Sequence, residues 1–202
     1  MSRNAGRGDP IRILDVVAVL LADKGVDGWV LSEVAAQAHS SLTTIYKHFG
    51  ARDELIVSAV ERWMQQNIYN PIPSPSPSSS PFEALTDMFR AIFEPWEEHP
   101  EMLHVFVRAS ATPGRDRLRA QGQQAVAVVF EKCRAELRTS FVDDLNVILT
   151  SVVEGAMTRY LNGEIEVIEI RSAVEKALLW LERGYYADLT AGGGRRTGRV
   201  HR

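Results

Sequence analysis

The stretch LSEVAAQAHSSLTTIYKHFGARDEL, residues 31–55, carries the most specific pattern in this chain. It holds two short segments with helical spacing of apolar residues, Leu31–Ala38 and Leu42–Phe49. Only His39-Ser40-Ser41 separates the two segments, and Gly50 follows the second. Two short helices joined by so short a turn have the spacing of a helix-turn-helix.

The side chains of this stretch agree with that geometry. Ala35 falls where the two helices would cross, and a larger side chain there would push them apart. Ser41 is placed to cap the second helix. The apolar positions that can face the preceding helix are Val34, Ala38, Ile45 and Phe49. The outward positions are Thr43, Thr44, Lys47 and His48, with Tyr46 near the helix centre.

The outward residue types suit a nucleic acid. Hydroxyl groups and backbone amides at a helix N-terminus bind phosphate oxygens, and a lysine adds positive charge. A helix in the major groove can meet base edges with Thr, His and Lys side chains. The spacing alone fits a generic pair of helices with a polar face equally well, so both interpretations stay open at this point.

Helical periodicity dominates the rest of the chain, and the fold class that we predict is all-α. Helix 11–24 follows a candidate N-cap, Asp9, with Pro10 at the first helical position, and ends at Gly25. The further helices are expected at 31–38, 42–49, 52–67, 82–97, 100–110, 115–139, 142–162 and 168–189. Pro95 is expected to kink or end its helix. Residues 71–81, PIPSPSPSSSP, are expected to form a surface loop or spacer.

Composition excludes several classes of protein. The 202 residues are 45% hydrophobic and 24% charged, as in an ordinary globular protein. The longest apolar run, residues 16–22, is too short to cross a membrane. The single cysteine, Cys133, excludes an intrachain disulfide and a multi-cysteine zinc site. Because the N-terminal residues also lack a secretory pattern, a cytoplasmic location is expected.

Charge is unevenly distributed, although the net charge is only −3. Residues 1–52 carry six bases and five acids, residues 53–190 carry 13 bases and 21 acids, and residues 191–202 carry four arginines and no acid. The acidic middle should repel nucleic acid. A polyanion is therefore expected to bind the first 52 residues or the tail, although a basic tail can also serve solubility alone.

Particular residues in and around the motif give information beyond the spacing of its helices. They are Ile13-Leu14, Lys24-Gly25, Val34-Ala35, Ala38, Ser41 and the run TIYKHFGARDEL at 44–55. Through these residues, positions 10–55 resemble the N-terminal domain of the TetR (tetracycline-repressor) family of bacterial transcription regulators. The resemblance implies a helix-turn-helix DNA-binding domain with a basic N-terminal arm over 1–52. It further implies a helical effector-binding and dimerisation domain over 53–190 and a flexible basic tail over 191–202.

The resemblance assigns DNA contacts to a defined set of side chains. They are Ser32, Ser41, Leu42, Thr43, Thr44, Tyr46, Lys47, His48 and Arg52. Tyr46 and Arg52 would contact phosphates, whereas Thr43, Thr44 and Lys47 would meet base edges and Leu42 a thymine methyl group. Two arginines of the arm, Arg3 and Arg7, would either reach the DNA or remain solvated.

Three positions depart from the family's pattern. His39 and Ser40 replace the usual glycine and small apolar residue of the turn, and Arg52 replaces the usual lysine. Glycine is preferred in that turn because the backbone tends to a positive φ, which histidine adopts only with some strain. Arginine keeps the charge of lysine but changes the geometry of a phosphate contact.

One such module would bind DNA weakly, so the resemblance implies a homodimer that reads two half-sites about one helical turn (~34 Å) apart. The predicted dimer contacts lie on the last two long helices, which would form a four-helix bundle with their symmetry mates. They are Val152, Gly155, Ala156, Arg159, Val174, Ala177, Leu178, Leu181 and Tyr185. The alternative is that these side chains serve only the core of the monomer.

The resemblance also implies a small-molecule cavity among the middle helices, which are rich in aromatic and methionine side chains. The predicted lining residues are Trp63, Phe89, Ile92, Phe93, Trp96, Leu103, His104, Phe106, Arg108, Phe130, Thr150 and Met157. Three of them, His104, Arg108 and Thr150, would be polar anchors. A small, largely hydrophobic effector would shift the helix at 52–67 and release the DNA, as in a repressor; activation is the alternative outcome.

Neither catalysis nor a metal or cofactor site is predicted. Glu101 and His104 form one copy of a Glu-x-x-His spacing that di-iron bundles use twice. No phosphate loop, Gly-x-Ser-x-Gly or His-Glu-x-x-His motif occurs. The alternative function is a helical small-molecule-binding or protein-interaction module whose helix-turn-helix no longer reads DNA. His39 and the acidic middle of the chain favour that alternative.

Overall fold

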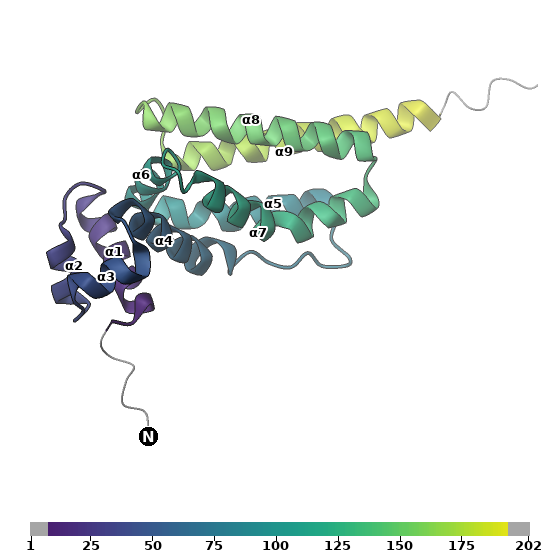
Figure 1. Ribbon diagram of the computed structural model, residues 1–202. Coiled ribbons are helices and arrows are strands. Elements are labelled where there is room, and N and C mark those ends of the chain that lie inside the picture. Colours follow the sequence, from purple (N-terminus) through teal and green to yellow (C-terminus); the bar gives the residue numbers. More distant parts are fainter. Residues whose placement is uncertain (1–7, 194–202) are drawn as a thin grey trace, which may run out of the picture. The chain divides into compact units, whose positions relative to one another are not determined.

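The computed structural model describes residues 8–193, and this part of the chain is helical and contains no strand (Figure 1). The all-α prediction is therefore confirmed. The helices are α1 (Pro10–Lys24), α2 (Leu31–Gln37), α3 (Leu42–Phe49), α4 (Arg52–Met64), α5 (Pro81–Glu98), α6 (Pro100–Ala109), α7 (Arg115–Glu136), α8 (Thr139–Leu161) and α9 (Val167–Gly193). A π-helical turn, Gln65–Tyr69, directly follows α4.

The ends of the first helix follow from its sequence. The Asp9 carboxylate accepts a hydrogen bond from the Ile11 amide at 3.0 Å, and Pro10 is the first helical residue. At the other end Gly25 adopts a φ of 69°, a value that favours glycine. Of the two outcomes expected at Pro95, a kink or the end of the helix, the second does not occur, since α5 continues to Glu98. The helix continues because a proline removes only its own amide donor, while the His99 amide still reaches the Pro95 carbonyl at 2.9 Å.

The helices gather into two compact units. One unit comprises the chain up to Ile72 together with Glu94–Val126, and the other comprises Pro73–Phe93 together with the chain from Ala127 onward. The functional boundary expected at residue 52 stays a prediction, because these units are groups of packed helices. The first unit includes α4 and α6 because α6 packs against both α1 and α4.

The first unit is built on the contact between α1 and α4. Ile13, Val17 and Leu21 of α1 are fully buried, as are Leu55 and Val60 of α4. A second layer comes from α6, whose Met102, Leu103 and Val105 are also buried. The helices α2 and α3 pack against α1 and against each other through few buried apolar side chains.

The turn before α7 lies unusually close to α4. A Cβ atom added at Gly114 would come within 2.5 Å of Val57 Cγ2, and both residues are buried. Real Cβ atoms almost never approach other atoms so closely, so glycine is required there by packing. The Gly114 amide also donates a hydrogen bond to Thr112 Oγ1 at 3.4 Å.

We expect Gly114→Ala to lower the free energy of unfolding by about 1–3 kcal/mol, because the added methyl group overpacks the contact with Val57. The double variant Gly114→Ala, Val57→Ala makes room on α4 and should recover part of that loss, relative to Val57→Ala alone. Urea unfolding of the four proteins in this cycle measures the coupling. Strictly additive effects of the two substitutions would contradict the close approach.

In the second unit, α8 and α9 lie side by side as an antiparallel pair (Figure 1). Leu145 and Leu149 of α8 are buried, as are Val174 and Leu178 of α9. Burial raises the pKa of the neighbouring Cys133 thiol to about 11, with Glu136 as a lesser cause. This cysteine is therefore protonated and inert at neutral pH, as its apolar surroundings require.

Aromatic side chains tie α5 and α8 to the end of α9. The rings of Phe141 and Tyr185 lie 4.5 Å apart between centroids, and Phe82 lies 6.1 Å from Tyr185. The Tyr185 hydroxyl accepts a hydrogen bond from the Arg138 amide at 3.2 Å. Tyr185 therefore belongs to the interior of the second unit.

The segment rich in proline and serine forms no helix between Pro71 and Ser80, as predicted. It ends in a reciprocal cap on α5. The Glu83 amide donates to Ser80 Oγ at 3.1 Å, and the Ser80 amide donates to Glu83 Oε2 at 2.7 Å. This pair is a capping box, which starts α5 immediately after the spacer.

Candidate nucleic-acid interface

The pair α2 and α3 has the geometry of a helix-turn-helix. Val34 and Ala38 of the first segment and Ile45 of the second are buried, so three apolar side chains hold the pair against the rest of the unit. His39 has a φ of 51°, the one positive value at a non-glycine residue within residues 8–193. The conformation expected for the turn is therefore present despite the missing glycine, at a cost in backbone strain.

The N-terminus of α3 is capped as predicted. Ser41 Oγ accepts a hydrogen bond from the Thr44 amide at 3.0 Å, and it lies 2.8 Å from Thr44 Oγ1. These two hydroxyl groups hydrogen-bond to each other. Gly8 also lies against this end of α3, because a Cβ atom added to it would come within 2.8 Å of Thr44 Cγ2. Arg3 and Arg7 precede it and lie outside the described residues.

The face of α3 that points away from the buried core of the first unit is open to solvent. Tyr46 is 51% exposed and Leu42 is 42% exposed, although both are large and partly apolar. The other predicted DNA contacts that are exposed are Ser32, Ser41, Thr43, Lys47 and His48, while Thr44 is half-buried. Most of the predicted DNA contacts on α3 are therefore accessible to solvent, and so is Ser32 on α2.

Arg52 differs from the other predicted contacts because its guanidinium group turns towards the chain itself. Its Nη2 atom donates to the backbone carbonyls of Val26 at 2.7 Å and Trp29 at 3.2 Å. The same group stacks on the Trp29 ring, with Cζ 4.3 Å from the ring centroid. A phosphate contact by this side chain would have to compete with these interactions.

Comparison with known families decides what this arrangement is. Residues 13–59 match the model described as "Bacterial regulatory proteins, tetR family", and residues 79–181 match the model described as "Tetracyclin repressor-like, C-terminal domain". The two matches together span the helix-turn-helix and most of the helices that follow it. The chain belongs to the TetR family.

Individual relatives of this TetR-family protein are distant. It is 23% identical over 166 residues to an uncharacterized HTH-type transcriptional regulator, YerO, of Bacillus subtilis (strain 168). That match covers 77% of the chain and 57% of YerO, so the chain spans little more than half the length of this curated relative.

Solved structures of two other regulators share the fold. A TetR-like transcriptional regulator from Rhodococcus sp. RHA1 is 19% identical with a TM-score of 0.61, covering 91% of this chain and 98% of that one. A transcriptional regulator of the TerR/AcrR family from Aquifex aeolicus VF5 is 22% identical with a TM-score of 0.59, covering 85% and 98%.

The TetR-family assignment settles the class of function. Its two matched domains are those of the TetR family of bacterial regulatory proteins, a family of DNA-binding transcriptional regulators and not of enzymes. Within residues 8–193, no three side chains of the types that bind metals gather in one place. In the same range, none of the helices combines the length and the apolar character that a membrane crossing requires.

The residues predicted to line an effector cavity are divided between the two units. In the first unit Trp63, Trp96 and Phe106 form one aromatic cluster, with centroids 5.0 Å apart between the tryptophans and 5.6 Å between Trp96 and Phe106. Leu103 is buried in that unit, and His104 is exposed. An apolar ligand can contact these aromatic side chains only where other side chains do not already cover them. Trp63 and Phe106 are half-buried, so part of each ring is uncovered.

Arg108 has a different environment from the polar anchor that was expected. Its Nη1 atom pairs with Asp27 Oδ2 at 2.7 Å, and both side chains are largely exposed. Arg108 therefore joins the end of α6 to the connection between α1 and α2.

The remaining predicted cavity residues belong to the second unit. Phe89 and Phe93 are buried with stacked rings whose centroids lie 6.4 Å apart. Ile92, Phe130 and Met157 are half-buried, whereas Thr150 is exposed. An exposed threonine is poorly placed to anchor a ligand in an apolar cavity.

The predicted dimer contacts fall into two groups. Four of them, Ala156, Val174, Leu178 and Tyr185, are buried by the chain's own helices. Because a buried side chain offers no surface to a second protomer, these four fit the alternative that they serve the monomer core. Gly155 and Arg159 are exposed, and Val152, Ala177 and Leu181 are half-buried, so these five remain candidates.

Sequence reasoning missed the apolar side chains that are exposed on α8 and α9. They are Val147, Ile148, Leu161, Ile168, Leu179, Trp180, Tyr186 and Leu189. Trp180 is 68% exposed, which is unusual for a tryptophan in a folded protein. The sequence did contain a sign of this exposed apolar surface. It is the helical spacing of Ile168, Leu179 and Tyr186, which places them on one side of α9.

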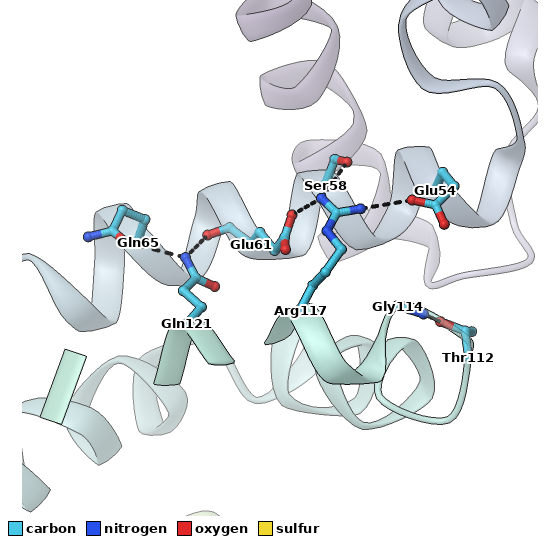
Figure 2. Close-up of polar contacts among 8 residues, drawn as sticks. All are labelled: Glu54, Ser58, Glu61, Gln65, Thr112, Gly114, Arg117 and Gln121. Atoms are coloured by element: carbon cyan, nitrogen blue, oxygen red, sulfur yellow. Dashed lines mark hydrogen bonds and ion pairs between the residues drawn. The ribbon is translucent and has the colours of Figure 1, made fainter. Parts of the chain in front are cut away.

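A polar network between α4 and α7 was also missed (Figure 2). Arg117 Nη1 pairs with Glu54 Oε2 at 2.8 Å, and its Nη2 atom pairs with Glu61. Gln121 Nε2 donates to the Glu61 carbonyl at 2.9 Å and to Gln65 Oε1 at 3.3 Å. These contacts join the start of α7 to the helix that begins two residues after α3 ends.

Proposed function

We propose that this TetR-family protein is a repressor that binds a palindromic operator as a homodimer and is released by a small, largely hydrophobic effector. The observation that carries the proposal is the exposed face of α3, on which Tyr46 and Lys47 lie beside Thr43 and His48. An exposed helix face with a basic residue and hydroxyl groups matches the requirements of major-groove binding.

The homodimer is supported by the exposed apolar side chains of α8 and α9. Apolar groups at this density on one helix pair are a common mark of a protein interface. A second copy of the chain is the partner proposed, because two-fold homodimers are the commonest assembly and a palindromic operator needs two reading helices.

The effector is proposed to act on the helices that follow the DNA-binding module. Because α4 carries Trp63 near one end and begins directly after α3, a ligand that moves α4 also moves the reading helix. The contacts of Arg117 and Gly114 with α4 offer a second route to the same helix. A coupling of about 1–3 kcal/mol between effector and DNA is typical of such regulators.

Selection of duplexes from a randomised library tests the proposal. The wild-type protein should enrich a palindrome whose half-sites lie about one helical turn apart or a multiple of it. Binding should weaken steeply as salt rises. A thermal-shift screen of apolar metabolites should then find a compound that both stabilises the protein and lowers its affinity for the selected duplex.

Two results would contradict the proposal. Enrichment of no duplex would favour the helical module that no longer reads DNA, and enrichment of a single asymmetric site would exclude the symmetric dimer. The positive φ at His39 and the intact cap at Ser41 weigh against the first result.

A further inference from the structure

Arg52 connects the two ends of the helix-turn-helix to each other. Val26 and Trp29, whose carbonyls accept its hydrogen bonds, belong to the connection that precedes α2. Arg52 itself is the first residue of α4, which follows α3. A single side chain therefore closes the segment from Trp29 to Arg52, and this segment contains both helices of the DNA-binding motif.

The surroundings of the Arg52 guanidinium group stabilise this contact. Trp29 is only 3% exposed, so its ring provides a fixed apolar surface under the guanidinium group. The two Nη2 hydrogens are directed at two different carbonyls, which a planar guanidinium can satisfy while stacked on the ring. Hydrogen bonds from a charged donor are stronger than neutral ones, and stacking adds to them.

Closing this segment matters because the segment is otherwise weakly fixed. Its buried side chains are only Trp29, Val34, Ala38 and Ile45. The turn between the helices holds His39 in a strained backbone conformation. Strain of this kind persists only where surrounding contacts restrict the alternatives. The Arg52 contact supplies such a restriction at the point where the segment returns to the core.

We propose that Arg52 is a positioning residue for DNA reading, which orients α3 by fastening α4 to the connection before α2, and that it does not neutralise a phosphate. This inference rests on the DNA-binding role of α3. It reverses the role that the family resemblance gave to this position, where lysine is usual. A lysine ammonium can bind a phosphate. It is not planar, however, so it cannot stack on an aromatic ring while donating hydrogen bonds to two carbonyls in a fixed geometry.

The substitution Arg52→Lys separates the two roles because it keeps the charge and removes the planar fork. We expect it to weaken binding to a duplex selected by the wild-type protein about ten-fold, the effect of losing charged hydrogen bonds. The slope of log affinity against log salt should stay at the wild-type value, because the number of phosphates neutralised is unchanged.

Lys47→Gln is the matched control on α3. It removes an exposed cation from the proposed DNA face, so its salt slope should fall by about 0.9 for each protomer. Trp29→Leu is a second test, since it removes the stacking surface without altering any charge. It should reproduce the Arg52→Lys result, with weaker binding and an unchanged slope.

The salt slope remains informative if a variant is partly unfolded, because a constant inactive fraction shifts the apparent affinity and not its slope. Wild-type affinity in Arg52→Lys, together with a reduced slope in Arg52→Gln, would overturn the inference and make Arg52 a phosphate contact. If the wild-type protein itself selects no duplex, the proposed function fails, and the inference fails with it.

Discussion

Replacing Tyr46 and Lys47 together with alanine is expected to abolish binding to the proposed operator without changing the fold or the proposed dimer. Tyr46 is 51% exposed, and Lys47 is exposed on the same helix. Each good contact contributes about 1–3 kcal/mol, and two protomers that each lose two contacts lose at least about 4 kcal/mol. A loss of at least about 1,000-fold in affinity is therefore expected. Electrophoretic retardation of the selected duplex measures it.

The stability of the double variant distinguishes a reading surface from a core. Substitutions at exposed positions usually change the free energy of unfolding by no more than about 0.5 kcal/mol. The matched control is Arg119→Ala, Gln123→Ala, which removes a base and a polar side chain from the exposed face of α7 and should bind DNA normally. A large drop in melting temperature for the Tyr46 and Lys47 variant would instead show that these residues hold the fold together.

Replacing Leu179 and Trp180 with glutamate is expected to give monomers. The two side chains are 42% and 68% exposed in the protomer, so the substitution should leave its fold nearly unchanged. In a dimer formed through α9, the same positions would bury two unpaired charges from each protomer, at a cost that apolar contacts cannot offset. We expect the dissociation constant of the dimer to rise at least about 100-fold.

Sedimentation velocity measures the change in assembly. Val128→Glu is the control, because Val128 is 54% exposed on α7 and should accept the charge without changing the assembly. Leu178→Glu is not an equivalent test, because Leu178 is only 2% exposed and the charge would unfold the second unit itself. If the wild-type protein sediments as the proposed dimer and the variant at Leu179 and Trp180 sediments in the same way, the interface lies elsewhere.

Local features of the fold could be predicted because they depend on neighbouring residues. Asp9, Gly25 and Ser41 act at helix ends through atoms a few residues away, so their identities alone indicate the caps. The strained turn at His39 was also predictable, because the spacing of the two helices fixes the backbone direction there.

Other features could not be predicted from periodicity. The helical spacing of apolar residues shows that Leu178 and Leu179 are adjacent on α9, but not which of them faces α8. The predicted interface therefore included the buried Leu178 and omitted the exposed Trp180. Arg108 and Arg117 were equally ambiguous, because their partners Asp27, Glu54 and Glu61 lie far away in the sequence.

The order of nearby side chains was enough to predict the helical class, the helix-turn-helix at residues 31–49, its cap at Ser41 and the family. Only the tertiary structure decided that Arg52 turns inward onto Trp29, and that α9 buries Leu178 and exposes Trp180. The physical reason is that the contacts of a long side chain or of an apolar helix face depend on which groups lie near it in space. Those positions depend on how segments distant in the sequence pack together.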